Sequence, residues 1–241
     1  MNATPNDGLW QPRGTFARWL VLAAMGVNLV ASLAMALILR DATAAGGDPV
    51  ARMAFIHAHP VLVTASWYGW ILASLGLVTI IFVVLRSLPG RPALHQLILT
   101  FLVIGAVPDI MNNAVGAALL PHLAARYADA DPALQAAIVL DFEVWDRFSV
   151  LLTGVIGNLF YGVAGFCLAF AASRVASFPR ALVWLQIPLW TATWAMVAAS
   201  VADSVPALIA SVASTMTLFC LWCVGVAFLW LGRPDATSDA D

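Results

Sequence analysis

The segment VPDIMNN places a carboxyl group and two amides inside a stretch that otherwise has the composition of a membrane span. Asp109, Asn112 and Asn113 recur there at spacings that put them on one face of an α-helix. A carboxyl group at such depth can hold a proton, bind a cation or donate a proton to a reacting molecule, while amides beside it can orient a polar group. The segment is therefore the first candidate for a functional site, and Asp109 is its only candidate catalytic residue.

The charge state of Asp109 decides which of these roles is open to it. An aspartate near the bilayer centre costs about 2.5–3.5 kcal/mol on insertion scales, and every arginine of the chain lies at the end of a span. We therefore expect the carboxyl group to be protonated, or else to be paired with a cation, a metal or a ligand amine. The purely structural alternative is a neutral Asp109 that is hydrogen-bonded to nearby amides and holds helices together.

A second polar stripe runs along the next apolar segment, residues 148–172. Asn158 and Tyr161 lie there at helical spacing with three glycines, and small residues let helices approach closely. The three glycines are Gly154, Gly162 and Gly165. At about 1.5 Å of rise per residue, Asp109 and Asn158 both fall within roughly 3 Å of the membrane midplane. The two stripes could therefore face each other.

Of the five tryptophans that lie too deep in their spans to belong to the aromatic belts at membrane surfaces, four are expected level with Asp109 or just above it. We predict that they form apolar walls of an outward-opening pocket between the second, third, fourth and fifth spans. Walls of this kind beside one carboxylate suit a hydrophobic or cationic small molecule, because each cation–π contact contributes about 0.5–2 kcal/mol. The predicted ligand-binding residues are Asp109, Asn112, Asn113, Asn158, Tyr161, Trp67, Trp70, Trp190 and Trp194.

A metal site is the weaker possibility. In an extended FIHAHP segment, His57 and His59 would share a side, and with Glu143, Asp146 or His122 they could bind a metal at the outer surface. Two histidines without a matching constellation do not define such a site, so we predict neither a metal nor a cofactor. The chain has no lysine for a Schiff base, and no histidine lies deep enough in a span to bind a transmembrane haem.

The elements that must position these residues follow from composition. Of 241 residues, 62% are hydrophobic and only 10% are charged, and the mean hydropathy is +0.92, which is typical of an integral membrane protein. Stretches long enough to span a bilayer cover residues 17–39, 61–85, 95–120, 148–172, 181–202 and 206–231. We predict an all-α, polytopic membrane protein: a six-transmembrane-helix bundle at 17–231, a cytoplasmic segment at 1–16 and a disordered cytoplasmic tail at 232–241.

Charge predicts the orientation of this bundle. Seven of the eleven arginines fall on the side of both termini and four fall on the other side, so both termini are expected in the cytoplasm of a bacterium whose inner membrane holds the protein. The net charge of −2 gives no reason to expect a nucleic-acid partner.

The third outer loop carries the sequence DPALQAAIVLDFEVWDR. Asp131 followed by Pro132 is a typical start of a helix, and apolar residues then recur at helical spacing. These apolar residues are Leu134, Ile138, Phe142 and Trp145. We predict an amphipathic helix that lies on the outer face or extends the fourth span upward, and that could cover the bundle as a lid.

The layout resembles uncharacterised six-span bacterial membrane proteins, families defined only as domains of unknown function. The resemblance rests on HAHP before the second span, VPD within the third and FPRALVWL at the start of the fifth. It implies a six-span bacterial membrane protein and carries over no site residue.

Three functions follow from these residues. The first is binding or transport of a hydrophobic or cationic small molecule, linked to a proton through Asp109. The second is a membrane-embedded enzyme that acts on a lipid or isoprenoid with Asp109 as general acid. The third is a non-catalytic subunit of a larger membrane complex, or a homo-oligomer, in which the polar and glycine faces only pack. In each case the lipid bilayer is the immediate partner.

Overall fold

The computed structural model describes residues 14–90 and 92–232, and this part of the chain contains helices and no strand. Six of its continuous helices are long and apolar enough to cross a membrane. They cover Thr15–Leu37, Pro60–Ser87, Pro92–Ala128, Pro132–Ser173, Arg180–Val201 and Val205–Trp230. The predicted all-α bundle with six transmembrane helices is therefore confirmed, and its apolar outer surface contacts lipid.

Shorter elements subdivide and connect these spans. The α-helices are α1 (Thr15–Leu37), α2 (Pro49–Ala58), α3 (Pro60–Ser87), α4 (Pro92–Ala114), α5 (Leu120–Ala128), α6 (Pro132–Leu151), α7 (Asn158–Ser173), α8 (Arg180–Val201) and α9 (Val205–Gly225). The 3₁₀ turns η1 (Leu39–Ala42) and η2 (Ala44–Gly46) follow α1. Three π-helical turns, η3 (Val115–Leu119), η4 (Leu152–Gly157) and η5 (Val226–Trp230), continue α4, α6 and α9.

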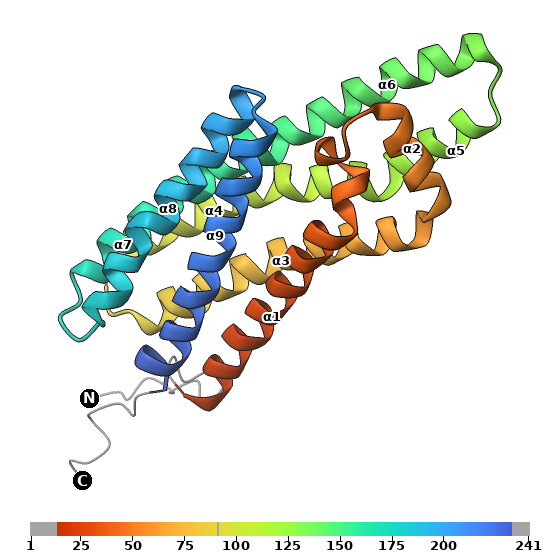
Figure 1. The fold of residues 1–241 in the computed structure, drawn as a ribbon. Helices are drawn as coiled ribbons and strands as arrows, with labels where there is room; N and C mark the ends of the chain where they lie inside the picture. The colour runs from red at the N-terminus through yellow and green to blue at the C-terminus, as the bar shows by residue number, and fades with distance from the viewer. Residues whose placement is uncertain (1–13, 91, 233–241) are drawn as a thin grey trace.

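The six spans pack as a closed ring in chain order. Helix α1 packs on α3, α3 on α4, α4 on α7, α7 on α8 and α8 on α9, and α9 with η5 returns to α1. Figure 1 shows the start of α1 and the end of α9 at the same end of the bundle, which we call the terminal end. Short connections between antiparallel neighbours produce this order, because each helix packs first on the one that follows it.

Two apolar cores stabilise the molecule. The larger core joins residues of α1, α3, α4, α7, α8, α9 and η5. The smaller core joins η1, α2 and the ends of α3 and α6 that lie away from the terminal end with η3 and α5. Along α4 and η3, Ala106 belongs to the first core and Ala117 to the second, and the polar run Asp109–Asn113 lies between them.

A helical cap formed by α2, α5 and the first half of α6 projects away from α8 and α9 (Figure 1). Helix α6 begins as predicted, because the Asp131 side chain accepts hydrogen bonds from the backbone N–H groups of Ala133 and Leu134 at 3.0 and 2.9 Å. It continues through η4 into α7, so the third loop extends the fourth span and does not lie flat on the outer face. Helix α2 begins with the same pair of residue types, Asp48 and Pro49.

A buried ion pair fastens α2 to α6. Arg52 Nη2 lies 2.6 Å from Asp146 Oδ1, and the two side chains are only 5% and 16% exposed. The guanidinium also lies over the ring of Phe142, 5.0 Å from its centroid. Because the pair is largely removed from water, loss of either charge would leave the other one buried and unpaired.

Some predictions fall outside the part of the chain that the structure describes. They are the segment before Gly14, the tail from residue 233 onward, and the arginines at positions 13, 91 and 233 that contribute to the predicted orientation.

Candidate functional site

Asp109 lies on α4 immediately after Pro108, within the helix and only 8% exposed. Proline has no N–H group, so the backbone carbonyl one turn earlier lacks its usual donor. Small residues bring the next span close at this level. A Cβ atom on Gly105 would lie 2.9 Å from the carbonyl oxygen of Gly157, and one on Gly157 would lie 3.6 Å from Cβ of Asp109. Two helices can therefore enclose the carboxyl group.

Three hydroxyl groups from three elements bind this carboxyl group. Ser74 Oγ of α3 lies 2.7 Å from Oδ2, and Tyr161 Oη of α7 lies 3.1 Å from the same oxygen. Thr153 Oγ1 of η4 lies 2.8 Å from Oδ1. No guanidinium hydrogen-bonds to Asp109 in the described residues, so its partners are all uncharged.

The Ser74 hydroxyl makes this cluster able to accept one proton. It carries a single hydrogen, and two acceptors lie within reach: Asp109 Oδ2 at 2.7 Å and the carbonyl oxygen of Trp70 at 2.9 Å. With an ionised carboxylate, Ser74 donates to Asp109. With a protonated carboxyl group, Asp109 donates to Ser74, which then donates to Trp70. The two states differ by one proton and the rotation of one hydroxyl group.

The amides beside the carboxyl group retain unused hydrogen-bonding capacity. Asn112 Nδ2 donates to Asn113 Oδ1 at 3.2 Å. Asn113 is only 2% exposed, and its Nδ2 lies near Asp109 without making a hydrogen bond of normal geometry. Asn158 is also buried, and its side chain makes no hydrogen bond with any residue that the structure describes. A fully buried amide donor normally has a partner, so Asn113 Nδ2 points to a polar group that belongs beside it.

The fourth span meets Asp109 through Thr153 and Tyr161, whereas the sequence pattern pairs it with Asn158. The reason is the π-helical turn η4, which contains one more residue per turn than an α-helix would. This extra residue rotates Thr153 onto the stripe of Tyr161 and turns Gly154 away, so that Gly154 packs against the Ser200 side chain of α8. Thr153 is thus a site residue that α-helical periodicity misses.

The four deep tryptophans do not share one wall. Trp67 of α3 covers Gly116 of η3, where an added Cβ would lie 2.5 Å from the ring. Trp190 and Trp194 of α8 cover Gly165 and Gly162 of α7. These three indoles therefore fill notches over glycines at two different helix interfaces. Trp70 packs at the edge of the smaller core, with a buried Nε1 that has no hydrogen-bond partner.

The histidine segment is helical, whereas a metal site at His57 and His59 would require it to be extended. His57 lies within α2, and His59 is the residue between α2 and α3, with its ring 4.9 Å from that of Phe55. Asp146 is occupied by Arg52. Among the described residues, no three histidine, cysteine or acidic side chains are grouped so that they could hold a metal ion.

Two surface hollows lie away from Asp109. One, of about 540 Å³, lies between α7 and α8 near the terminal end. The other, of about 350 Å³, is a shallow depression along the start of α3. Asp109 and the other predicted ligand-binding residues line neither of them.

Comparison with protein-family models, curated proteins and solved structures yields no match for this chain. The resemblance to six-span bacterial families stays a prediction, and the proposals below depend on the geometry alone.

Proposed function

We propose that this protein binds a small molecule with a cationic or polar head and a hydrophobic body at Asp109, and that it carries this molecule across the membrane in exchange for a proton. The observation that carries the proposal is a buried carboxyl group with only uncharged partners, beside which the buried Asn113 Nδ2 is left without a hydrogen bond of normal geometry. A cationic head would replace the proton of Asp109, and the amides would orient it.

The three hydroxyls give the exchange its physical basis. Ser74, Thr153 and Tyr161 satisfy the carboxylate when it is ionised, and a hydroxyl rotation satisfies it when it is protonated. The site can therefore release a proton to water when a cation takes its place at the carboxylate, without leaving a buried group unpaired. The carboxyl group is enclosed in the described conformation. On this proposal, the protein has at least two conformations, and the described one is closed. Two π-helical turns are the elements we expect to move: η3, which follows Asp109 closely in the chain, and η4, whose Thr153 donates to Asp109.

Binding tests this function most simply. Purified protein in lipid nanodiscs is titrated with phenethylamine and tetraphenylphosphonium, with 2-phenylethanol as a neutral probe. We expect the cations to bind the wild type at least tenfold more tightly than Asp109→Asn, and the neutral alcohol to bind both alike. The matched control is Glu143→Gln, which neutralises an exposed acid of α6. Equal binding of the cations to wild type and Asp109→Asn would show that the carboxyl group does not select the ligand.

The hydrogen-bond network also favours a second candidate function. Asp109 ties together α3, α4 and the η4–α7 helix, which is the arrangement expected of a polar group that only fixes helix packing. The protein would then be a non-catalytic subunit of a larger membrane complex, or a homo-oligomer. This reading predicts that Asp109→Asn lowers stability and that no cationic probe distinguishes it from the wild type. No observation favours the enzyme, because Asp109 is the only acid deep in a span.

We infer that the terminal end of the bundle faces the cytoplasm of a bacterium and that the protein resides in the inner membrane. Arg18, Arg86, Arg174 and Arg180 lie at this end. Arg40, Arg52, Arg126 and Arg147 lie at the other end, where the charges of Arg52 and Arg147 are matched by the carboxylates of Asp146 and Asp203. A fluorescent protein fused to the C-terminus should therefore fluoresce. Alkaline phosphatase fused at the same position should be inactive, because it is active only outside the cytoplasm.

A further inference from the structure

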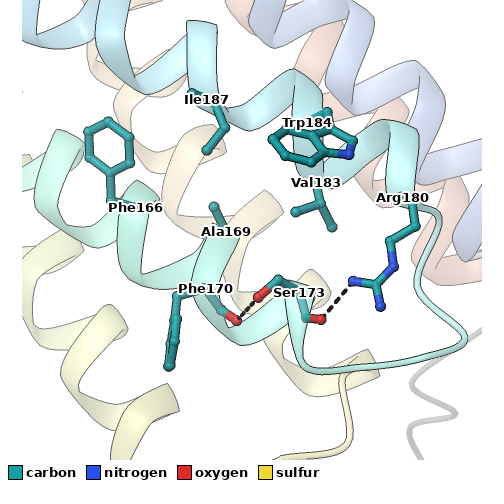
Figure 2. A pocket seen from close by; sticks show the side chains of 8 residues that line it. All are labelled: Phe166, Ala169, Phe170, Ser173, Arg180, Val183, Trp184 and Ile187. Atoms are coloured by element: carbon teal, nitrogen blue, oxygen red, sulfur yellow. Dashed lines mark hydrogen bonds between the residues drawn. The ribbon is translucent and has the colours of Figure 1, made fainter.

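The hollow between α7 and α8 is an apolar groove that opens to the outside of the bundle (Figure 2). Its lining residues are Phe166, Ala169, Phe170, Ser173, Arg180, Val183, Trp184 and Ile187. Aromatic and aliphatic side chains form its walls, and its volume is about 540 Å³. Trp184 stands at its rim with 73% of its surface exposed. This groove is separate from the Asp109 site.

Two guanidinium groups flank the groove where α7 ends and α8 begins. Arg180 Nη1 donates to the carbonyl oxygen of Ser173 at 2.8 Å, as Figure 2 shows. The guanidinium of Arg174 lies over the ring of Phe170, with its Cζ atom 4.8 Å from the ring centroid. Both arginines are exposed, and neither forms an ion pair with a carboxylate in the described chain. Each guanidinium has five N–H donors, so most of them remain available.

The depth of these groups matches the layers of a lipid leaflet. The turn that joins α7 to α8 lies at the terminal end of the bundle, where we expect its arginines to be level with lipid headgroups. An exposed tryptophan such as Trp184 is typical of the boundary between headgroups and acyl chains. Below it, Phe166 and Ile187 continue the groove along the two spans. Positive charge thus lies at one end of the groove and apolar surface fills the rest.

We propose that this groove is a binding site for an anionic phospholipid, with one acyl chain between α7 and α8 and the phosphate held by Arg174 and Arg180. The unpaired positive charges select the phosphate and the anionic headgroup, because basic clusters at this level recruit anionic lipids. The apolar walls hold the chain. A free phosphate ion would use only the two arginines and would gain nothing from the groove, so lipid is the ligand that fits the whole site.

Quenching of Trp184 fluorescence by brominated lipids tests the site directly. The full-length protein is placed in bilayers in which brominated phosphatidylglycerol or brominated phosphatidylcholine replaces part of the unlabelled lipid. The contribution of Trp184 is the difference between the wild type and Trp184→Phe. We expect phosphatidylglycerol to quench Trp184 with an apparent affinity about 25 times that of phosphatidylcholine, because each of the two arginines contributes about fivefold. In Arg174→Gln/Arg180→Gln the two lipids should quench alike.

Arg86→Gln is the matched control, because Arg86 is an exposed arginine at the same end of the bundle, on α3 and outside the groove. It should keep the full preference. Added inorganic phosphate should not reduce the quenching, since it lacks the acyl chain. The proposal is overturned if wild type shows no preference, if Arg86→Gln loses as much as the double variant, or if inorganic phosphate removes the effect. None of these results depends on whether Asp109 binds a cation.

Discussion

Gly116→Ala tests the packing of the tryptophans around the site. In the structure the indole of Trp67 covers Gly116, and an added Cβ would lie 2.5, 2.6 and 2.7 Å from three of its ring atoms. Real Cβ atoms do not approach neighbours so closely, so either the indole or η3 has to move. Trp67 is itself buried in the smaller core, which leaves the ring little room to shift.

The size of the effect follows from two opposing contributions. Overpacking a well-filled core costs about 1–3 kcal/mol. Replacing a helical glycine by alanine returns about 0.5–1 kcal/mol, because alanine loses less backbone entropy on folding. We expect a net loss of about 1–2 kcal/mol in the free energy of unfolding. For a chain of this size each kcal/mol lowers Tm by about 2–4 °C, so the apparent Tm should fall by about 2–8 °C.

Thermal unfolding of purified protein in one detergent provides the assay. The matched control is Gly69→Ala on α3, the helix that carries Trp67, because an added Cβ there meets nothing within 4 Å. It should leave Tm unchanged or raise it slightly. In the variant Gly116→Ala/Trp67→Phe the smaller ring should restore part of the lost stability. If Gly116→Ala is as stable as Gly69→Ala, the indole does not fill this notch and a cavity could exist beside it.

Two further substitutions test other contacts. Tyr161→Phe removes one hydroxyl group from Asp109 and should lower the free energy of unfolding by about 1 kcal/mol. The control, Tyr68→Phe on the exposed face of α3, should leave it unchanged. Equal Tm values for the two variants would argue against the hydrogen bond. Arg52→Met leaves Asp146 as an unpaired charge and should cost about 3–5 kcal/mol, while Arg52→Met/Asp146→Leu should recover most of it. An unchanged Tm for Arg52→Met alone would mean that the ion pair does not hold the cap. Both comparisons use the same thermal assay.

Composition predicted the spans because apolar length is a strong constraint in a membrane. The predicted 17–39 and the observed Thr15–Leu37, for example, differ by two residues at each end. Helix α6 was predictable from Asp131 and Pro132. Helix α2 starts with the equivalent pair, Asp48 and Pro49, in a segment for which composition predicts only a loop between two spans. The same capping signal would have revealed it, and with it the helical setting of His57.

The site was predictable only in part, for a geometric reason. The deep carboxyl group is visible in the sequence, because a charge in an apolar run has no other explanation than a site or a packing role. Its partners depend on helix rotation, and the turn η4 changes that rotation without a signal in the residue types of Leu152–Gly157. Depth in a span predicts the level of a tryptophan, but it says nothing about the direction of the side chain. Trp190, for example, packs on Gly165 of α7.

Measurement of proton release on ligand binding would show whether Asp109 exchanges a proton for a cation. Wild type and Asp109→Asn are titrated with phenethylamine in weakly buffered solution, and the pH change is compared with the amount of ligand bound. The account predicts close to one proton released per cation bound to wild type, and neither tight binding nor release for Asp109→Asn, while Glu143→Gln behaves as wild type. Binding of the cation without proton release, or equal release from Asp109→Asn, would contradict the assignment of Asp109 as the group that exchanges a proton for a ligand.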